Sequence, residues 1–260
     1  MLKGRAAVVT GSTSGIGWGI ARALAGAGAD LVLNGFGDAA EIDASRASLA
    51  AEFGVRVLYD PADLADPAGP ARLVERAREE FGRLDVLVNN AGIQHVAPVE
   101  EFPVERWDAV IALNLTAVFL GMRAAIPHLR EGGWGRIVNV ASAHGLVASA
   151  NKVAYVAAKH GVVGATKVAA LELANSGVTV NAICPGWVLT PLVERQIADR
   201  ARQNGTDVAR ESEALLAEKQ PMLAFTTPEA IGAMALYLCS DAAATVTGAA
   251  LSIDGGWTAQ

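Results

Sequence analysis

The stretch Arg5-Ala-Ala-Val-Val-Thr-Gly-Ser-Thr-Ser-Gly-Ile-Gly17 decides the fold of this 260-residue chain. Arg5–Thr10 is a short apolar run that predicts a buried strand, and the apolar periodicity over residues 16–27 predicts a helix. The glycines between them let the backbone approach a pyrophosphate, whose charge is favoured by the free N–H groups and dipole of a helix N-terminus. The spacing Gly-x-x-x-Gly-x-Gly departs from the usual Gly-x-Gly-x-x-Gly, so the prediction of a dinucleotide site depends on the flanking strand and helix.

Short apolar strands and helical stretches alternate along the chain. The predicted strands are Arg5–Thr10, Asp30–Asn34, Arg56–Tyr59, Leu84–Asn89, Arg136–Ala141, Thr179–Cys184 and Ala250–Ile253. The predicted helices lie near residues 16–27, 38–53, 67–81, 104–130, 153–175 and 227–239. This alternation predicts an α/β fold: a Rossmann-type, doubly wound, seven-stranded parallel sheet flanked by helices, in a single domain over residues 1–260. Such sheets bind ligands outside the C-terminal ends of their strands.

Residues 190–222 interrupt this alternation. They form a charged helical insertion after the sixth predicted strand, beside the edge where a ligand would bind. We therefore expect a small helical lid that closes over the substrate. An ordinary pair of surface helices is the alternative.

The composition limits the classes of function. Apolar residues make up 52% of the chain and charged residues 18%, and the net charge is −6. This charge argues against nucleic-acid and anionic-membrane partners, which need a basic face. We expect neither a membrane span, because no run approaches ~18 apolar residues, nor a signal peptide, because the first apolar run stops at Gly11. Cys184 and Cys239 predict buried thiols, so we expect a cytoplasmic protein, and we predict no metal site.

Tyr155 and Lys159 stand four residues apart, thirteen residues after Ser142. On a helix the first two side chains share a face. The ammonium group would lower the pKa of the phenol from its usual ~10, and a bound cationic nicotinamide ring would lower it further. Ser142 would hold the substrate oxygen. The three residues predict alcohol–ketone chemistry if a hydride carrier lies beside them.

The ordered motifs resemble those of the short-chain dehydrogenase/reductase family over essentially the whole length. The matching motifs are Thr10–Gly17, Asn89-Asn-Ala-Gly92, the tetrad Asn114, Ser142, Tyr155 and Lys159, Pro185-Gly186, and Asp254-Gly-Gly256. The resemblance implies that Tyr155 is the general acid/base and that Lys159 lowers the pKa of Tyr155 and holds the nicotinamide ribose. It also implies that Ser142 polarises the substrate oxygen and that Asn114 anchors a water in a proton relay.

The resemblance also implies a set of cofactor-binding residues. They are Gly11, Thr13, Ser14, Gly15, Ile16, Gly17, Phe36, Asp63, Leu64, Asn90, Ala91, Gly92, Leu113, Tyr155, Lys159, Pro185, Gly186, Val188 and Thr190. NAD-preferring relatives usually carry an acidic residue at the end of the second strand, whereas here the first carboxylate is Asp38. No Arg or Lys stands there either, and Ser14 replaces a basic residue common in NADP users. Because a 2′-phosphate without a cation is poorly compensated, we expect NAD.

A second group of side chains is expected on the substrate side of Tyr155. Gln94, His144, Lys152 and Gln196 offer the charge and directed donors that a carboxylate needs, and Trp187 and Trp257 would wall a pocket for a short carbon chain. Taken singly, each could instead be solvated or structural. The stretches Asn34–Ile42, Asn90–His95, Ala141–Lys152 and Cys184–Trp187 resemble the D-3-hydroxybutyrate dehydrogenase branch of the family. That resemblance implies NAD-dependent, reversible oxidation of (R)-3-hydroxybutyrate to acetoacetate, with the four polar residues binding the carboxylate.

Two other functions stay open. A 3-oxoacyl-carrier-protein reductase has the same tetrad but would need an open channel, a basic docking patch and usually NADPH. A non-catalytic, nucleotide-sensing family member would keep the fold without turning over a substrate.

The helix predicted around Tyr155 also suggests self-association. It contains Gly161 and Gly164, although glycine costs about 1 kcal/mol against alanine in a helix. With Ala157 and Ala158 they would form a small-residue face for close packing against another copy. Because family members are commonly tetramers, we expect a homotetramer that acts on a small hydroxy or keto acid.

Overall fold

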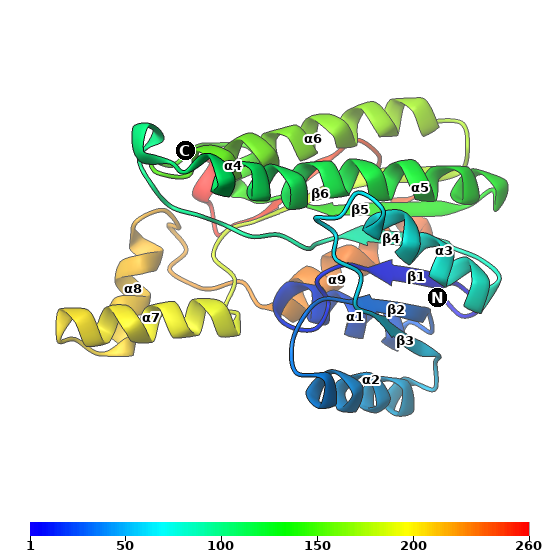
Figure 1. Ribbon diagram of the computed structural model, residues 1–260, viewed down its shortest axis with the longest axis horizontal. Coiled ribbons are helices and arrows are strands. Elements are labelled where there is room, and N and C mark those ends of the chain that lie inside the picture. The colour runs from blue at the N-terminus through cyan, green and yellow to red at the C-terminus, as the bar shows by residue number, and fades with distance from the viewer. Residues whose placement is uncertain (260) are drawn as a thin grey trace.

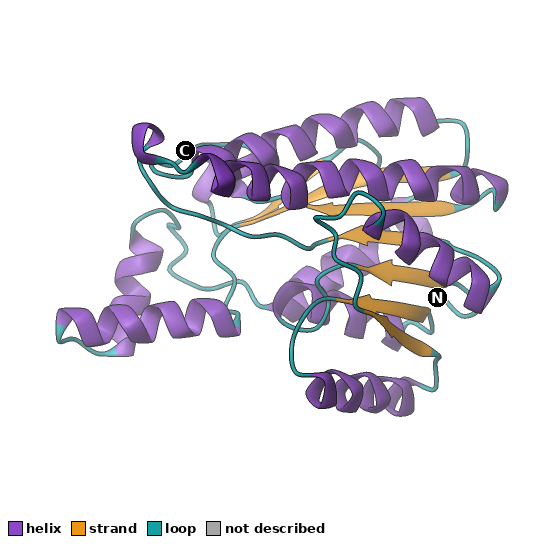
Figure 2. Cartoon of the chain, in the orientation of Figure 1, coloured by secondary structure: helices purple, strands orange, loops and turns teal. Residues whose placement is uncertain are grey.

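A seven-stranded parallel sheet forms the centre of the structure (Figures 1 and 2). The computed structural model describes residues 1–259, apart from the side chain of Leu192. The strands are β1 (Ala6–Val9), β2 (Asp30–Asn34), β3 (Val57–Asp60), β4 (Val86–Asn89), β5 (Gly135–Val140), β6 (Val178–Pro185) and β7 (Ala250–Ile253). Their order in the sheet is β3-β2-β1-β4-β5-β6-β7. The predicted seven-stranded, doubly wound fold is confirmed.

Helices cover both faces of the sheet. The helices α1 (Gly15–Gly26), α2 (Ala39–Phe53) and α9 (Pro228–Leu238) pack on one face, and α3 (Gly69–Phe81), α5 (Ala117–Glu131) and α6 (Val153–Leu173) pack on the other. Successive residues of a strand pack into the cores on opposite faces of the sheet. Val8 packs into the core beneath α3, α5 and α6, whereas Ala7 and Val9 pack into the core beneath α1 and α9. This alternation explains why the strands are apolar throughout. Cys184 and Cys239 are buried free thiols, as predicted.

The helix expected over residues 104–130 has three parts. It begins as α4 (Val104–Ile111), passes through a π-helical turn over Ala112–Thr116 and continues as α5. Contrary to the expectation from sequence, this 28-residue helix is long and apolar enough to cross a membrane by length and composition alone. A core helix passes the same test, and here the α5 part packs against α3, β4 and β5. We therefore interpret it as a core helix.

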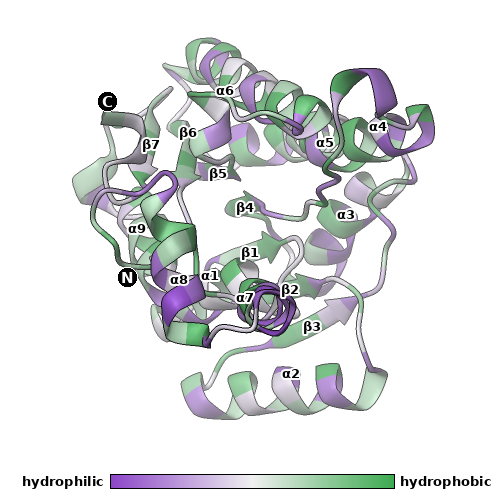
Figure 3. Cartoon of the chain, turned by 90° about the vertical axis from the view of Figure 1, so that its left-hand side faces the viewer, coloured by the Kyte–Doolittle hydropathy of each residue, from purple (hydrophilic) through white to green (hydrophobic). Residues whose placement is uncertain are grey.

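The insertion after β6 folds into two helices, α7 (Pro191–Asn204) and α8 (Val208–Ala217). Thr190 caps α7 by accepting a hydrogen bond from the Val193 amide, and Asp207 caps α8 in the same way. The two helices pack mainly on each other and project from the side toward which the strand arrows point (Figure 1). In the view from that side, α7 is largely hydrophilic (Figure 3). The insertion therefore lies beside the C-terminal edge of the sheet, as a lid requires.

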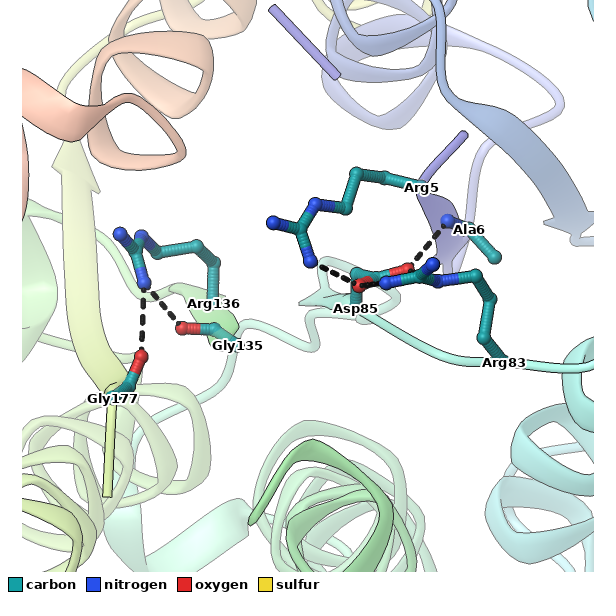
Figure 4. A network of polar contacts seen from close by, with 7 residues as sticks. All are labelled: Arg5, Ala6, Arg83, Asp85, Gly135, Arg136 and Gly177. Atoms are coloured by element: carbon teal, nitrogen blue, oxygen red, sulfur yellow. Dashed lines mark hydrogen bonds and ion pairs between the residues drawn. The ribbon is translucent and has the colours of Figure 1, made fainter. Parts of the chain in front are cut away.

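A charged cluster lies at the opposite end of the sheet, where the strands begin (Figure 4). The buried carboxylate of Asp85 accepts hydrogen bonds from Arg5, from Arg83 and from the Ala6 amide at 2.6–2.9 Å. The Arg5 guanidinium also lies over the Trp134 ring, 3.9 Å from its centroid. The carboxylate thus joins the starts of β1 and β4.

Replacing Asp85 by alanine is expected to lower the free energy of unfolding by about 2–4 kcal/mol, because a strand amide and two cations lose their acceptor. Chemical denaturation at fixed protein concentration would measure this loss. Asp43→Ala, which removes an exposed ion pair with Arg46, is the matched control and should cost less than about 1 kcal/mol. Equal losses in the two variants would contradict the structural role given to Asp85.

Candidate active site

The loop between β1 and α1 is shaped to admit an anion. Gly11 and Gly15 have positive φ angles of 60° and 54°, and a Cβ on Gly17 would lie 2.2 Å from the carbonyl oxygen of Gly11. At the N-cap of α1, Ser14 makes no side-chain capping bond. The first amides of the helix therefore have no side-chain acceptor from Ser14. Free amides at a helix N-terminus can bind a phosphate group.

A cavity of about 750 Å³ opens over this loop. The expected cofactor residues that line it are Gly11, Thr13, Ser14, Gly15, Ile16, Phe36, Asp63, Leu64, Asn90, Ala91, Gly92, Leu113 and Thr190. Gly17 lies beneath the loop, in contact with Gly11 and Asn90 rather than on the cavity wall. Pro185 ends β6 and does not line this cavity. The loop glycines and the open helix end fit a dinucleotide.

A second cavity, of about 490 Å³, adjoins the first, and both are lined by Ile16, Asn90, Gly92, Ile93 and Thr190. The predicted residues on its wall are Gln94, Ser142, His144, Lys152, Tyr155, Lys159, Gly186, Trp187, Val188 and Trp257. Among the described residues lining it there are two lysines and no carboxylate. The cavity therefore favours an anionic ligand.

Tyr155 and Lys159 lie on the first turns of α6, facing this cavity. The Lys159 ammonium donates a hydrogen bond of 2.7 Å to the Val140 carbonyl and lies 5.6 Å from the Tyr155 ring centroid. Burial lowers the pKa of Lys159 to about 8. Burial also raises the pKa of Tyr155, and a hydrogen bond with Ser142 offsets part of this effect. The net shift of the Tyr155 pKa is therefore upward, opposite to the lowering expected from Lys159, because desolvation is its largest cause.

Asn114 lies in the π-helical turn and is fully buried. Its side-chain oxygen accepts a hydrogen bond from the Ile93 amide, and its side-chain nitrogen donates one to the Ile93 carbonyl, both at 2.9 Å. The side chain thus fixes the loop after Gly92, between the two cavities. The side-chain oxygen and nitrogen both bond this backbone, and the water relay implied for Asn114 stays a prediction.

His144 connects the catalytic residues to the tryptophans. Its Nε2 lies 3.0 Å from the Ser149 hydroxyl, and its ring meets the Trp257 ring edge-to-face at 5.0 Å. Trp257 in turn stacks on Trp187 with ring centroids 6.2 Å apart. The ammonium of Lys152 lies 5.5 Å from the Trp187 ring centroid, and burial lowers its pKa. The aromatic rings and the lysine form one end of the cavity.

The structure departs from the sequence analysis on the lid. Gln196 is exposed on α7 and lines neither of these two cavities, which contain Val193 and Arg195 from the same helix. Arg195 is the one cation among the described residues lining the first cavity. The sequence analysis did not single out Arg195, because no sequence motif marks its position on α7. No group of His, Cys, Asp and Glu suited to a metal occurs in the described part of the chain.

Comparison with known proteins gives the family. A family model described as "Enoyl-(Acyl carrier protein) reductase" matches residues 11–258. The chain is 57% identical to the D-beta-hydroxybutyrate dehydrogenase of Cupriavidus necator, over 100% of both chains. It is 54% identical to the enzyme of that name from Rhizobium meliloti, over 98% of this chain and 99% of the relative. The chain belongs to the short-chain dehydrogenase/reductase family.

A solved structure of similar fold supports the same assignment. The L-sorbose reductase of Gluconobacter frateurii, in complex with NADPH and L-sorbose, superposes with a TM-score of 0.95 at 32% identity. The match covers 100% of this chain and 98% of that one. The predicted family and the Rossmann-type fold are thus confirmed, and this member of the fold holds a nicotinamide dinucleotide.

The acid stability of the protein should depend on His144. Burial, reinforced by Lys152, lowers the pKa of His144 to about 4, whereas an unfolded histidine titrates near 6.5. The unfolded state therefore takes up its proton first, and stability present above about pH 6.5 is lost as the pH falls toward 4. His144→Gln should reduce this loss by up to about 3 kcal/mol, measured by urea unfolding across that range. The exposed His160→Gln is the control, and identical pH slopes for all three proteins would refute the assignment.

Proposed function

We propose that this protein is an NAD-dependent dehydrogenase that reversibly oxidises (R)-3-hydroxybutyrate to acetoacetate. The observation that carries the proposal is the composition of the 490 Å³ cavity. Tyr155 and Ser142 stand on its wall, and the lining residues include Lys152 and Lys159 but no described carboxylate. A hydroxyl to be oxidised and a carboxylate to be bound both find partners there. The Cupriavidus necator and Rhizobium meliloti relatives, each more than 50% identical, are named for this substrate.

The chain's own residues supply acid–base chemistry and positioning. Ser142 donates a hydrogen bond to the substrate oxygen, while the Tyr155 phenolate accepts the hydroxyl proton. Lys159 stabilises the phenolate, and its own proton is readily exchanged because its pKa is about 8. Bound NAD would supply the hydride acceptor. Asn114 holds the Ile93 backbone, which keeps the wall between the two cavities in place.

Recognition of the acid depends on the opposite end of the cavity. Lys152 would pair with the carboxylate, and its partial desolvation makes that charge-assisted contact stronger than one in water. Neutral His144 and Gln94 would add directed hydrogen bonds. The stacked Trp187 and Trp257 limit the room for a longer chain, which disfavours the long arm of an acyl-carrier-protein substrate.

The choice of NAD over NADP is proposed from the N-terminus of α2. The Asp38 carboxylate accepts hydrogen bonds from the Ala40 and Glu41 amides at 2.9 and 3.0 Å. The carboxylate thereby places a negative charge at the N-terminus of α2, the end of this helix nearest Asn34. A 2′-phosphate would need a positive charge there. Glu41 also lines the cavity. A ribose with free hydroxyls is the better fit.

The segment 190–222, which contains the helices α7 and α8, is proposed to act as a lid. Thr190 lies against Gly15 at the base of α7, so the lid begins at the anion-binding loop. Arg195 would bind the pyrophosphate, because the other ionisable residues lining that cavity are Asp38, Glu41 and Asp63. Closure would bring Gln196, now exposed, toward the carboxylate.

Self-association is proposed through α5 and α6, which expose Phe119, Val168 and Leu171. The small-residue face expected from sequence is narrower than predicted. Gly161 packs against Leu115 of its own chain, whereas a Cβ on Gly164 would meet nothing. A homotetramer in the cytoplasm remains our proposal.

The function is tested by mixing the protein with (R)-3-hydroxybutyrate and NAD and following absorbance near 340 nm. We expect turnover with this acid and little with the S enantiomer. Tyr155→Phe should abolish turnover, because no group then takes the hydroxyl proton, while dinucleotide binding measured by calorimetry stays within about threefold. No oxidation by the wild-type protein would refute the proposed substrate. Preference for a 3-oxoacyl thioester with NADPH would favour the acyl-carrier-protein reductase, and nucleotide binding without any turnover would indicate a sensing protein.

The cofactor preference is tested by Asp38→Ser. Serine keeps a capping oxygen but removes the negative charge, so the ratio of Kd for NADP to Kd for NAD should fall at least tenfold. Fluorescence titration of both dinucleotides measures this ratio without turnover. Asp66→Ser, which changes an exposed turn carboxylate outside the cavity, is the matched control. An unchanged ratio in Asp38→Ser would show that this carboxylate does not select the cofactor.

A further inference from the structure

Gln220 is a buried polar residue at the foot of the lid, just after α8. Its side chain is only 1% exposed. The side-chain oxygen accepts a hydrogen bond of 3.1 Å from the Trp187 amide, and the side-chain nitrogen donates to the Ala224 carbonyl. The Gln220 side-chain amide thus links the segment at Trp187 to the segment that ends at Ala224, through its oxygen and its nitrogen.

Two glycines make room for this amide. A Cβ on Gly186 would lie 2.6 Å from the Gln220 side-chain oxygen, and a Cβ on Gly255 would lie 2.6 Å from Gln220 Cγ. The Met222 amide also donates a hydrogen bond of 3.0 Å to the Gly255 carbonyl. Gln220 is therefore enclosed between the end of β6 and the loop that follows β7.

These two segments carry the tryptophans at the end of the second cavity. Trp187 follows Gly186 directly, and Trp257 comes two residues after Gly255. The indole nitrogen of Trp187 is buried and has no hydrogen-bond partner among the described residues. The ring is therefore held by its contacts with Trp257 and Lys152 and not by a hydrogen bond, and the bond from the Trp187 amide to Gln220 is a polar anchor for this residue.

We propose that Gln220 is a positioning residue that fixes Trp187 against Trp257 and thereby sets the chain length of the acid that the cavity accepts. The proposal rests on the proposed function. Gln220 lines neither of the two cavities, and it acts through the Trp187 backbone. When Gln220 is lost, the stacked pair is released from one side and the cavity gains depth for additional methylene groups.

Two variants separate positioning from general stability. Gln220→Met keeps the side-chain length and removes both hydrogen bonds. Gln220→Glu keeps an oxygen that accepts from the Trp187 amide in either protonation state. Leu129→Ala is the control for loss of stability, because it creates a cavity in the buried core far from the tryptophans.

The first measurement is the ratio of kcat/KM for 3-hydroxybutyrate to kcat/KM for 3-hydroxyhexanoate. We expect Gln220→Met to lower this ratio at least tenfold, Gln220→Glu to restore much of it, and Leu129→Ala to leave it unchanged. The Kd for NAD should change less than twofold in all three variants. A uniform fall in activity with both acids, at an unchanged ratio, would overturn the proposal.

The second measurement needs no substrate. Hydrogen exchange of the Trp187 amide should accelerate more than tenfold in Gln220→Met, while the amides within β6 keep their protection. If the wild-type protein does not oxidise 3-hydroxybutyrate, the proposed function fails and this result still tests the role of Gln220. A Trp187 amide that stays protected in Gln220→Met would refute the anchor itself.

Discussion

Burial of Tyr155 and Lys159 in one cavity is the constraint on which the rest of the site depends. Desolvation disfavours both charged forms, so it raises the pKa of the phenol and lowers the pKa of the ammonium to about 8. At pH 7 the phenol of Tyr155 is therefore neutral, whereas Lys159 still keeps most of its proton. An added positive charge beside the phenol would favour the phenolate, so under the proposed function proton transfer depends on the bound dinucleotide. The same low-polarity surroundings strengthen every hydrogen bond made to the substrate.

The fold provides these surroundings through the switch in strand order. The strands β1 and β4 are neighbours in the sheet although β2 and β3 intervene in sequence. The loop after β1 carries the proposed anion site, and the loop after β4 carries Asn90 and Gly92, so the two cavities meet where these loops lie side by side. The end of β5 supplies Ser142 and the start of α6 supplies Tyr155. The π-helical turn places Asn114 against the β4 loop. The four proposed catalytic side chains thus come from three segments, which one sheet holds in place.

Much of this arrangement could be predicted from sequence because it is local. The glycine loop, the Tyr155–Lys159 spacing and the apolar strands are short-range patterns, and the strand bounds agree with the structure within two residues. Properties that depend on packing could not be predicted in this way. The sign of the Tyr155 pKa shift depends on burial, and the direction in which Gly161 faces depends on Leu115. The anchoring of Trp187 by Gln220 joins residues 33 positions apart and has no motif.

The central claim is that the phenol of Tyr155 becomes acidic only beside the bound cofactor. The chain has three tyrosines, so carbon-13 labelling at tyrosine Cζ gives three resonances, whose titration with pH can be followed by NMR. We predict that Tyr155 titrates above pH 10 in the free protein and at least one pH unit lower when NAD is bound. A pKa that is the same in both states would contradict the account.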